Sequence, residues 1–501
     1  MTDNYNIITF VGLTLFMLIL FYLAIKSRVK NNTIEVYALG NKSFSPLFVS
    51  LSLAASLTSA ATFIINPGFI ALYGLSAYLA FGVVMPIAIF FALVIFIKRF
   101  RSYGVNVKSI SIADWLGKRY ESQFLKIFFG FLSILLITFI ILICVGITKV
   151  VTKALNVDEL TVLIILVVLV FTYMMIGGAN AMVYTNSLQA ILMVIVAFIL
   201  IGSGVEFFVD KDINFIDSLQ HIDEQLIKPF NTESPLFRDF FEVVVCNAII
   251  GIAIVCQPHI LTKSLLIKKD SQVNKFLIYT ILILILFFSV VFAGFYARLY
   301  FPDLMFNGEL LKMDGIMSAY VVERFPIYLG IVVVLGLFAA GLSTLEGLIQ
   351  SIPTTITNDL IVPILNKIKP NNYREIKINN LVMVLVAIAS VVLSYQQLVS
   401  PSLSVGIFAQ NGVYAFFSAA FVPIFFGIFT ATKNKWIPII ASVVAVLTHF
   451  GVYYLELTPY MNKVAVKNPA VASALALIIS TSVGLIIYLV KPMKNKVVQY
   501  G

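Results

Sequence analysis

The chain has 501 residues, of which 60% are hydrophobic and only 12% are charged, and its mean hydropathy is +1.00. Soluble globular domains have a charged fraction of about 25%, so this composition excludes a soluble domain and predicts a polytopic membrane protein in a lipid bilayer. The formal net charge is +10.

Apolar stretches of about 20 residues recur along the chain, and each is long enough to cross a hydrocarbon core of about 30 Å as a helix. They predict an all-α protein with about 13 transmembrane helices in a single transmembrane domain, 1–501. The predicted spans are approximately 7–26, 45–73, 76–97, 125–148, 159–177, 181–204, 240–262, 272–297, 326–352, 378–398, 404–429, 435–455 and 469–490.

The first span, 7–26, follows the acidic stretch "MTDNYN", and no small-residue cleavage site comes after it. We therefore interpret it as a helix of the mature protein and not as a signal peptide. If the spans alternate, the connections rich in Lys and Arg share one side, and the acidic segment 205–235 lies on the other. The positive-inside bias then predicts a multi-pass protein of the cell membrane, with its N-terminus outside and its C-terminus in the cytoplasm. The positive charge is thus an inner-face property, and no nucleic-acid partner is expected.

The second span, 45–73, has several Ser and Thr residues followed by Asn66, Pro67 and Gly68. This pattern favours a discontinuous helix, whose unwound carbonyls would line a site at membrane depth. The alternative is a kinked helix in which the hydroxyls bond to carbonyls of their own helix.

The stretch "LFAAGLSTLEGLIQS", 337–351, places Ala340, Ser343, Thr344 and Gly347 on one helical face. Two hydroxyls together with backbone carbonyls would suit a hard monovalent cation. Close helix packing through small residues is the alternative. Glu346 stands in the same stretch as an intramembrane acid, a residue type that is costly to bury and usually functional.

Four stretches resemble the sodium:solute symporter family, whose members carry proline, galactose, sialic acid, pantothenate or iodide. They are "SLAASLTSAATF", "ISIADWLGKRY", "CQPHILTKSL" and "AAGLSTLEGLIQSIPTTITNDL". The resemblance implies a LeuT-like fold, in which two inverted five-helix repeats form a core, here about 45–429, with a discontinuous first core helix. Helix 7–26 and the helices of 435–490 would be peripheral, and the protein is expected to function as a monomer.

The resemblance also implies a Na⁺ site between the first and eighth core helices, with Na⁺ as the co-transported ion. Its ligands would be the carbonyls of Ala55, Thr58 and Ala340 and the hydroxyls of Ser343 and Thr344.

The chain departs from the family in "AMVYTNSLQAILM", where relatives usually have Thr-Asp-x-x-Gln. Asn186 replaces that Asp, between Thr185 and Gln189, while Glu346 stands on the eighth core helix. We hypothesise that the carboxylate has moved between helices, that Asn186 hydrogen-bonds Glu346, and that Glu346, Asn186 and Gln189 form a second cation or proton site. The alternative is a neutral Glu346 with a structural role.

For the substrate, Ser59 and Thr62 match family positions that contact it, and Asn247, Gln410 and Asn411 lie at plausible depth. Each could instead hydrogen-bond between helices, above all Asn247. Residues 79–97 have no polar side chain and 127–148 have no Lys or Arg. These absences favour a small neutral solute or a simple anion over a sugar.

Together these patterns predict a sodium-coupled secondary active symporter that imports a small organic solute or anion by alternating access. The alternatives are a transporter-like receptor or sensor that binds solute without moving it, and a proton-coupled carrier that uses Glu346. No cluster of nucleophile and base appears among the spans, so an enzyme is not expected. Four further residues belong to cytoplasmic motifs and are expected to fix helix ends or the inner gate, with solvated loop charges as the alternative: Arg119, His259, Lys263 and Asp359.

Overall fold

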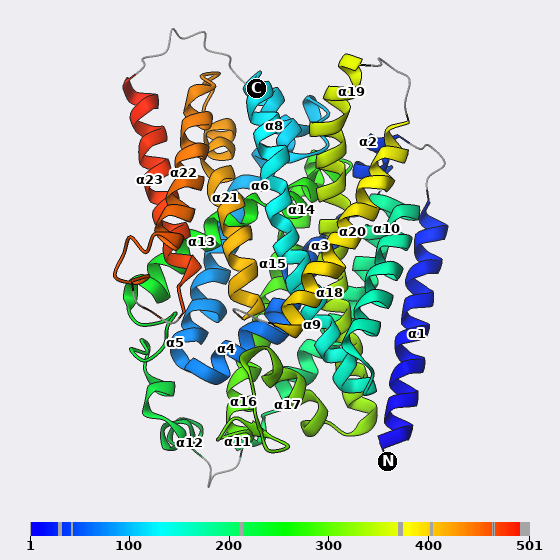
Figure 1. The fold of residues 1–501 in the computed structure, drawn as a ribbon, viewed down its shortest axis with the longest axis vertical. Coiled ribbons are helices and arrows are strands. Elements are labelled where there is room, and N and C mark those ends of the chain that lie inside the picture. The colour runs from blue at the N-terminus through cyan, green and yellow to red at the C-terminus, as the bar shows by residue number, and fades with distance from the viewer. Residues whose placement is uncertain are drawn as a thin grey trace.

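The computed structural model describes residues 2–28, 33–41, 44–209, 214–368, 374–400, 404–462, 464 and 466–490. Most of them lie in helices that run roughly along one common axis (Figure 1). In chain order the α-helices of the first part are α1 (Thr2–Ser27), α2 (Ile34–Leu39), α3 (Pro46–Leu57), α4 (Asn66–Tyr73), α5 (Leu75–Tyr78), α6 (Met85–Asn106), α7 (Ile112–Arg119), α8 (Gln123–Leu132), α9 (Ile137–Leu155), α10 (Glu159–Gly202), α11 (Glu206–Val209) and α12 (Phe215–Ile222).

The second part continues with α13 to α23, and short 3-10 or π-helical segments, labelled η, extend or join several helices. The helices are α13 (Asn247–Ala253), α14 (Pro258–Leu261), α15 (Val273–Ser289), α16 (Ala293–Tyr300), α17 (Ile316–Arg324), α18 (Ile327–Thr355), α19 (Val362–Ile368), α20 (Glu375–Val399), α21 (Val405–Phe429), α22 (Trp436–Tyr454) and α23 (Pro469–Val490). The η segments used below are η1 (Ala61–Ile65), η5 (Phe241–Cys246), η6 (Ile254–Cys256) and η7 (Thr262–Leu266). Strands β1 (Met305–Phe306) and β2 (Glu309–Leu310) form a small antiparallel hairpin.

Within the described residues, ten helices are long and apolar enough to cross a membrane, or up to twelve if each of two bent pairs counts as one span. The all-helical polytopic fold is therefore confirmed, but the count of thirteen is not. The difference arises at α10, which contains two of the predicted spans. Its backbone leaves helical geometry only at Gly178, with φ 54° and ψ −144°, a conformation that glycine reaches without a steric penalty.

The predicted break in the second span is confirmed. Pro46–Leu57 and Ala61–Tyr73 are bent by 54°, and α3 ends at Thr58, with φ −99° and ψ 83°. A second break, between Phe241–Cys256 and Pro258–Leu266, is bent by 63° and was not predicted. It falls at Gln257, whose extended backbone (φ −77°, ψ 146°) is the conformation imposed on a residue before proline. The first span of each expected repeat is thus discontinuous.

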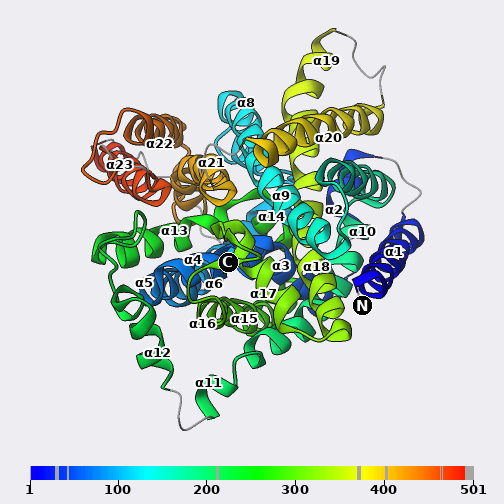
Figure 2. The ribbon, with the colours of Figure 1, turned by 60° about the horizontal axis from the view of Figure 1, so that its bottom comes forward.

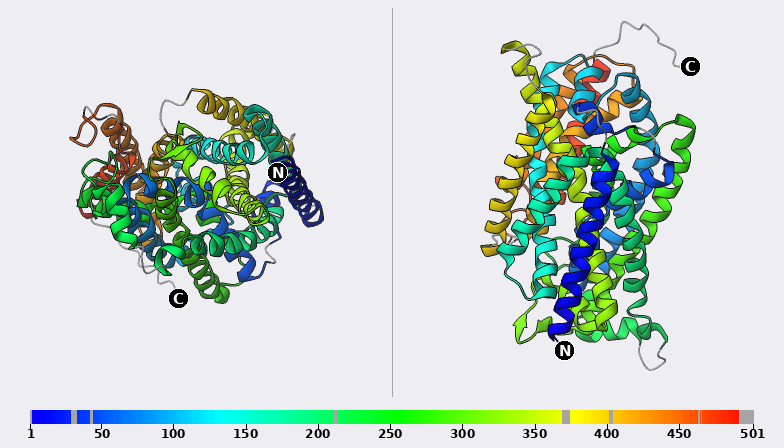
Figure 3. Two further views of the ribbon diagram at one scale, coloured as in Figure 1. Left: turned by 90° about the horizontal axis from the view of Figure 1, so that it is seen from below. Right: turned by 90° about the vertical axis from the view of Figure 1, so that its right-hand side faces the viewer.

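The bundle has a buried centre and an apolar periphery. In the most apolar stretch of each helix, 78% of residues are buried in Val405–Phe429 and 72% in Ile327–Ile368, against 33% in Asn6–Ser27. Figure 2 shows α3, α4, α14 and α18 near the middle, with α1 on one side and α22 and α23 on the other. The right panel of Figure 3 shows α1 running along one face of the molecule. Large apolar side chains such as Phe10 and Leu18 remain exposed there, as expected of a surface covered by lipid.

Arg119, at the end of α7, binds the end of α21. It is buried, and it donates to the carbonyl oxygens of Gly427 at 2.8 Å, Thr430 at 2.6 Å and Thr432 at 3.1 Å. Gly427 and Thr430 lie at the C-terminal end of α21, where a helix leaves carbonyls without partners in its own helix, and Thr432 lies in the connection that follows. The expected role of Arg119 at a helix end is confirmed, and a solvated loop charge is excluded.

We expect Arg119→Gln to destabilise the protein by about 2 kcal/mol, because buried carbonyls lose hydrogen bonds to a charged group. The measurement is thermal unfolding of the purified protein in detergent. Lys433→Gln is the control, since Lys433 pairs with Glu121 at 2.8 Å while both side chains are more than 70% exposed. It is expected to leave the melting temperature unchanged. Equal shifts for the two variants would contradict this role for Arg119.

Candidate functional site

The break after α3 meets the hydroxyls of α18 in the buried centre of the bundle. Ser343 Oγ lies 2.9 Å from the carbonyl oxygen of Ala55 and 2.9 Å from that of Ala340. Thr344 Oγ1 lies 3.0 Å from the carbonyl oxygen of Ser56. All five residues are buried. A hydroxyl oxygen that donates one hydrogen keeps two lone pairs, so these oxygens fit a small hard cation.

The structure therefore brings together four of the five expected ligand residues: Ala55, Ala340, Ser343 and Thr344. Thr58 is buried at the end of α3, and its hydroxyl donates to the carbonyl of Ala54 at 2.7 Å, within its own helix. Across the described part of the chain, no group of three or more His, Cys, Asp or Glu residues is arranged to hold a metal ion. The oxygens of this cluster are thus all neutral, which suits a monovalent ion that must also leave.

Glu346 lies at the centre of a second polar cluster between α10 and α18. Its carboxylate accepts hydrogen bonds from Tyr173 Oη at 2.6 Å, from Gln189 Nε2 at 2.6 Å and from the Thr185 hydroxyl. All four side chains are buried. All three partners are neutral, and the Thr185 hydroxyl also lies 2.9 Å from the carbonyl oxygen of Ala181 in its own helix.

The expected hydrogen bond between Asn186 and Glu346 is not formed. Asn186 Nδ2 donates instead to Ser56 Oγ at 2.9 Å, to Ser52 Oγ at 3.3 Å and to the carbonyl oxygen of Ser343 at 3.1 Å. The reason is helical periodicity. Thr185 and Gln189 are four residues apart and share the face of α10 that meets Glu346, while Asn186 is turned about 100° from Thr185, toward α3.

Three further residues of the cytoplasmic motifs are buried, so none is a solvated loop charge. Lys263, on η7, donates to Ser52 and Ser56 of α3. Asp359 accepts from Ser111 Oγ at 2.5 Å and pairs with Lys126 at 3.3 Å. His259 packs closely against Gly347 of α18. A Cβ atom added to this glycine would lie only 3.2 Å from the Cβ of His259.

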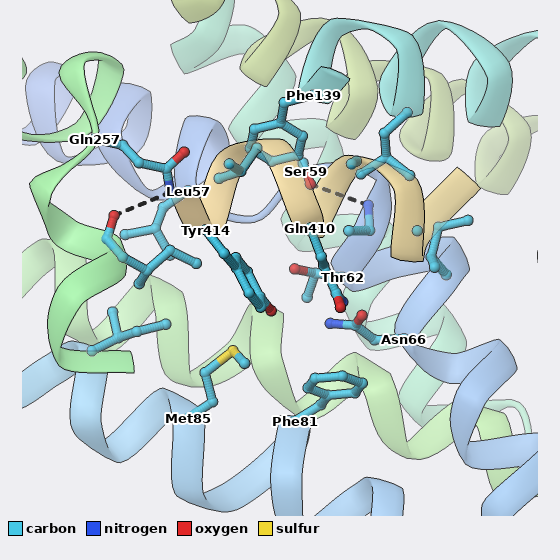
Figure 4. A pocket seen from close by; sticks show the side chains of 18 of the residues that line it. Leu57, Ser59, Thr62, Asn66, Phe81, Met85, Phe139, Gln257, Gln410 and Tyr414 are labelled. Atoms are coloured by element: carbon cyan, nitrogen blue, oxygen red, sulfur yellow. Dashed lines mark hydrogen bonds between the residues drawn. The ribbon is translucent and has the colours of Figure 1, made fainter. Parts of the chain in front are cut away.

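A cavity of about 90 Å³ lies beside the break in the first core helix. Figure 4 shows the polar ends of Thr62, Asn66 and Gln410 close together, with the hydroxyl of Tyr414 directed into the same space. The remaining walls are mainly apolar. The lining residues are Leu57, Ser59, Ala61, Thr62, Ile65, Asn66, Phe81, Met85, Ile89, Phe139, Leu142, Ile254, Gln257, Phe288, Gly406, Ala409, Gln410, Val413 and Tyr414. None of them is charged.

Three of the expected substrate residues, Ser59, Thr62 and Gln410, line this cavity, and two do not. Asn247 donates to the carbonyl of Glu242 at 2.8 Å, within its own bent span. Asn411 donates to Tyr454 Oη at 3.1 Å and lies 2.9 Å from His449 Nε2, both on α22. Gln410 therefore lines the cavity, while its neighbour Asn411 points toward α22.

The cavity has three polar residues that the sequence analysis did not assign to the substrate: Asn66, Gln257 and Tyr414. Two of them had a local signal, since Asn66 precedes Pro67 at the predicted break and Gln257 precedes Pro258 in the Gln-Pro-His stretch. Tyr414 lies four residues after Gln410 and so shares its helical face. Tyr173, which binds Glu346, had no such signal in its apolar span.

Comparisons with known proteins agree with this arrangement. The model of the sodium:solute symporter family matches residues 37–436. The sodium/pantothenate symporter of Escherichia coli (strain K12) is 26% identical over 351 residues, which cover 68% of this chain and 69% of that protein. The sodium/pantothenate symporter of Haemophilus influenzae is 25% identical over 296 residues, covering 57% and 58%.

Two solved structures share the fold. A Na⁺-coupled sialic acid symporter, solved in a substrate-bound outward-open state, aligns with a TM-score of 0.78 and 17% identity over 98% of this chain and 99% of that chain. A nucleobase-cation-symport-1 family transporter, solved in a closed conformation, aligns with a TM-score of 0.52 and 12% identity over 93% and 97%.

Proposed function

The chain belongs to the sodium:solute symporter family, and we propose that it imports a small neutral solute or simple anion together with Na⁺ by alternating access. One observation carries the coupling. The hydroxyls of Ser343 and Thr344 on α18 meet the carbonyls of Ala55 and Ser56 at the end of α3. A cation bound by Ala55, Thr58, Ala340, Ser343 and Thr344 would join these two helices directly.

The substrate would bind in the cavity beside this cluster. Ser59 and Thr62 line this cavity and follow directly after the carbonyls at the break. The ion and the solute would therefore bind to the same broken span. Since no lining residue is charged, a substrate with a high charge would have no counter-charge in the cavity. An anion would be stabilised only by hydrogen bonds and by the N-terminal end of the outer half-helix. Pantothenate, which the curated relatives carry, is thus one candidate among small monoanions.

Glu346, Asn186 and Gln189 would form a second cationic site one turn away from the first. The side-chain oxygens of Asn186 and Gln189 are buried and have no hydrogen-bond partner among the described residues. A buried acceptor without a hydrogen-bond partner costs folding free energy. A cation beside Glu346 would bind to these oxygens and remove that cost.

The protein would lie in the cell membrane with its N-terminus outside and its C-terminus in the cytoplasm. Helices α2 and α19, which flank Lys- and Arg-rich connections, share one end of the molecule, and α11 and α12 lie at the other (Figure 1). We further propose that a core of about 45–429 acts as one transporting unit with helix 7–26 and the helices of 435–490 around it, that a monomer suffices, and that the protein has no enzymatic activity.

Removal of the α18 hydroxyls is expected to weaken Na⁺ binding. Ser343→Ala and Thr344→Val each remove one ligand, and each should raise the half-saturating Na⁺ concentration about tenfold or more, the effect of a lost interaction with a charged group. The measurement is Na⁺-dependent uptake into proteoliposomes. Ser351→Ala is the matched control, because its hydroxyl returns to the carbonyl of Leu348 in the same helix. An unchanged Na⁺ dependence in both variants would refute the site.

A thermal-shift screen of small solutes, with Na⁺ and with K⁺ in its place, is expected to give a ligand that raises the melting temperature only with Na⁺. Gln410→Leu should abolish this shift, since Gln410 lines the cavity. Asn411→Leu should lower the starting melting temperature but keep the shift, since Asn411 faces α22. Counterflow of the same solute in liposomes distinguishes a symporter from a sensor, which would bind it without exchange.

Glu346→Gln is expected to raise the half-saturating Na⁺ concentration of uptake by about tenfold. The variant removes a buried negative charge near the cation, and at an effective dielectric constant of about 20 such a charge contributes more than 1 kcal/mol over several ångströms. Uptake is measured against Na⁺ and against pH, since a carrier that binds a proton at Glu346 would instead lose its pH dependence. If neither dependence changes, Glu346 has only a structural role.

A further inference from the structure

Lys263 is a buried cation with no adjacent counter-charge. It lies on η7, just past the second helix break, and is 1% exposed. Its ammonium donates to the carbonyl oxygen of Ser52 at 2.6 Å, to Ser52 Oγ at 2.9 Å and to Ser56 Oγ. Within the described residues no carboxylate oxygen lies within 4.0 Å of it, although several other lysines form such pairs. Burying an ammonium is costly unless a negative charge lies nearby and its hydrogens are all used.

The oxygens around this ammonium belong to the wall of the proposed Na⁺ site. Ser56 Oγ, which accepts from Lys263 and from Asn186, donates at 2.8 Å to the carbonyl oxygen of Ser343. The hydroxyl of the same Ser343 is one of the proposed Na⁺ ligands. A single serine therefore separates the ammonium from the cation cluster, and η7, α3, α10 and α18 all contribute to the contact.

Glu346 is the carboxylate that balances this charge. It is 0% exposed, it lies on α18 three residues past Ser343, whose carbonyl oxygen accepts from the same Ser56 that binds Lys263, and its described partners are all neutral. His259 also faces this region, and its Nδ1 has no partner among the described residues. The cluster thus contains one amine and one carboxyl group that can balance each other's charge, on different helical segments.

With Lys263 in place, the serine hydroxyls beside Asn186 bind an ammonium and are not free to bind a second metal ion. Asn186 donates to the same two serine hydroxyls as Lys263, so both groups act as donors toward a shared set of acceptors. A metal ion at this place would need those hydroxyl oxygens as ligands, and in the wild-type protein they already accept hydrogen bonds from the ammonium of Lys263. The amide oxygens of Asn186 and Gln189 have no hydrogen-bond partner among the described residues. A mobile cation could use them as further ligands.

We propose that the ammonium of Lys263 is a tethered cation that takes the place of a second sodium ion beside the proposed Na⁺ site, with Glu346 as its counter-charge. The proposal rests on the proposed function, because it assumes a sodium ion at Ser343 and Thr344. It limits the wild-type protein to one sodium ion per solute.

The test measures sodium itself and needs no knowledge of the solute. Equilibrium binding of radioactive sodium to the purified protein in detergent is expected to give one ion per wild-type chain. Lys263→Met frees the oxygens of Ser52 and Ser56 and leaves Glu346 without its counter-charge. This variant should therefore bind two ions, with a Hill coefficient that rises from about 1 toward about 2.

The variants form a charge cycle. Lys263→Arg keeps the cation and should bind one ion, and Lys263→Met combined with Glu346→Gln removes both charges and should also bind one. Lys268→Met, an exposed lysine on the same segment, is the control for loss of a positive charge and should match the wild type. If Lys263→Met is unstable without sodium, thermal unfolding against sodium concentration should show stabilisation with a two-ion dependence.

Two results would overturn the proposal. The first is a wild-type protein that binds two sodium ions, since no place is then left for the ammonium. The second is a Lys263→Met variant that binds one ion with the wild-type affinity. A wild-type protein that binds no sodium would instead refute the proposed function.

Discussion

The contact between the end of α3 and the hydroxyls of α18 is the interaction on which the rest of the structure depends. Backbone carbonyls released by a helix break at membrane depth must find partners, because lipid provides none. Ser343 and Thr344 supply them for Ala55 and Ser56. The oxygens that meet at the break are also those that a hard cation would use. The same contact therefore satisfies the backbone carbonyls at the break and supplies the ligands for the ion.

Because that contact joins two different helices, an ion bound there would stabilise one relative position of them. The cavity begins immediately beyond the break, at Ser59 and Thr62. A solute bound in it would touch the half of the span that begins at Ala61, while the ion would touch the half formed by α3. Ion and solute would therefore increase each other's affinity by the same factor, which is the thermodynamic requirement for coupling. The second break, at Gln257, brings another polar side chain to the same cavity.

The buried charges around this centre are arranged by the same constraint. A lone ion at membrane depth is costly, and a pair is tolerated when every hydrogen and lone pair near the charges is used. Lys263 uses oxygens of α3, and Glu346 uses donors from α10. The neutral Asn186 donates to the same serine hydroxyls as Lys263 and to the carbonyl of Ser343. Charge balance is thus distributed over four segments and does not depend on one salt bridge.

The sequence by itself determined the helical membrane fold, the presence of a break in the second span and the cluster of Ala340, Ser343 and Thr344, while the position of that break at Thr58, eight residues before Asn66, came from the structure. Each of these follows from local rules: about 20 apolar residues for a span, helix-breaking residues in the middle of one, and the helical period that places side chains on one face. The two helices on either side of the kink at Gly178 also follow from the sequence, as the spans 159–177 and 181–204. Only the tertiary structure decided that Asn186 turns toward α3, that Gln410 and not Asn411 faces the cavity, and that Lys263 is buried against Ser52 and Ser56. These facts depend on the rotation and depth at which helices distant in sequence pack together, and hydropathy and periodicity carry no information about either.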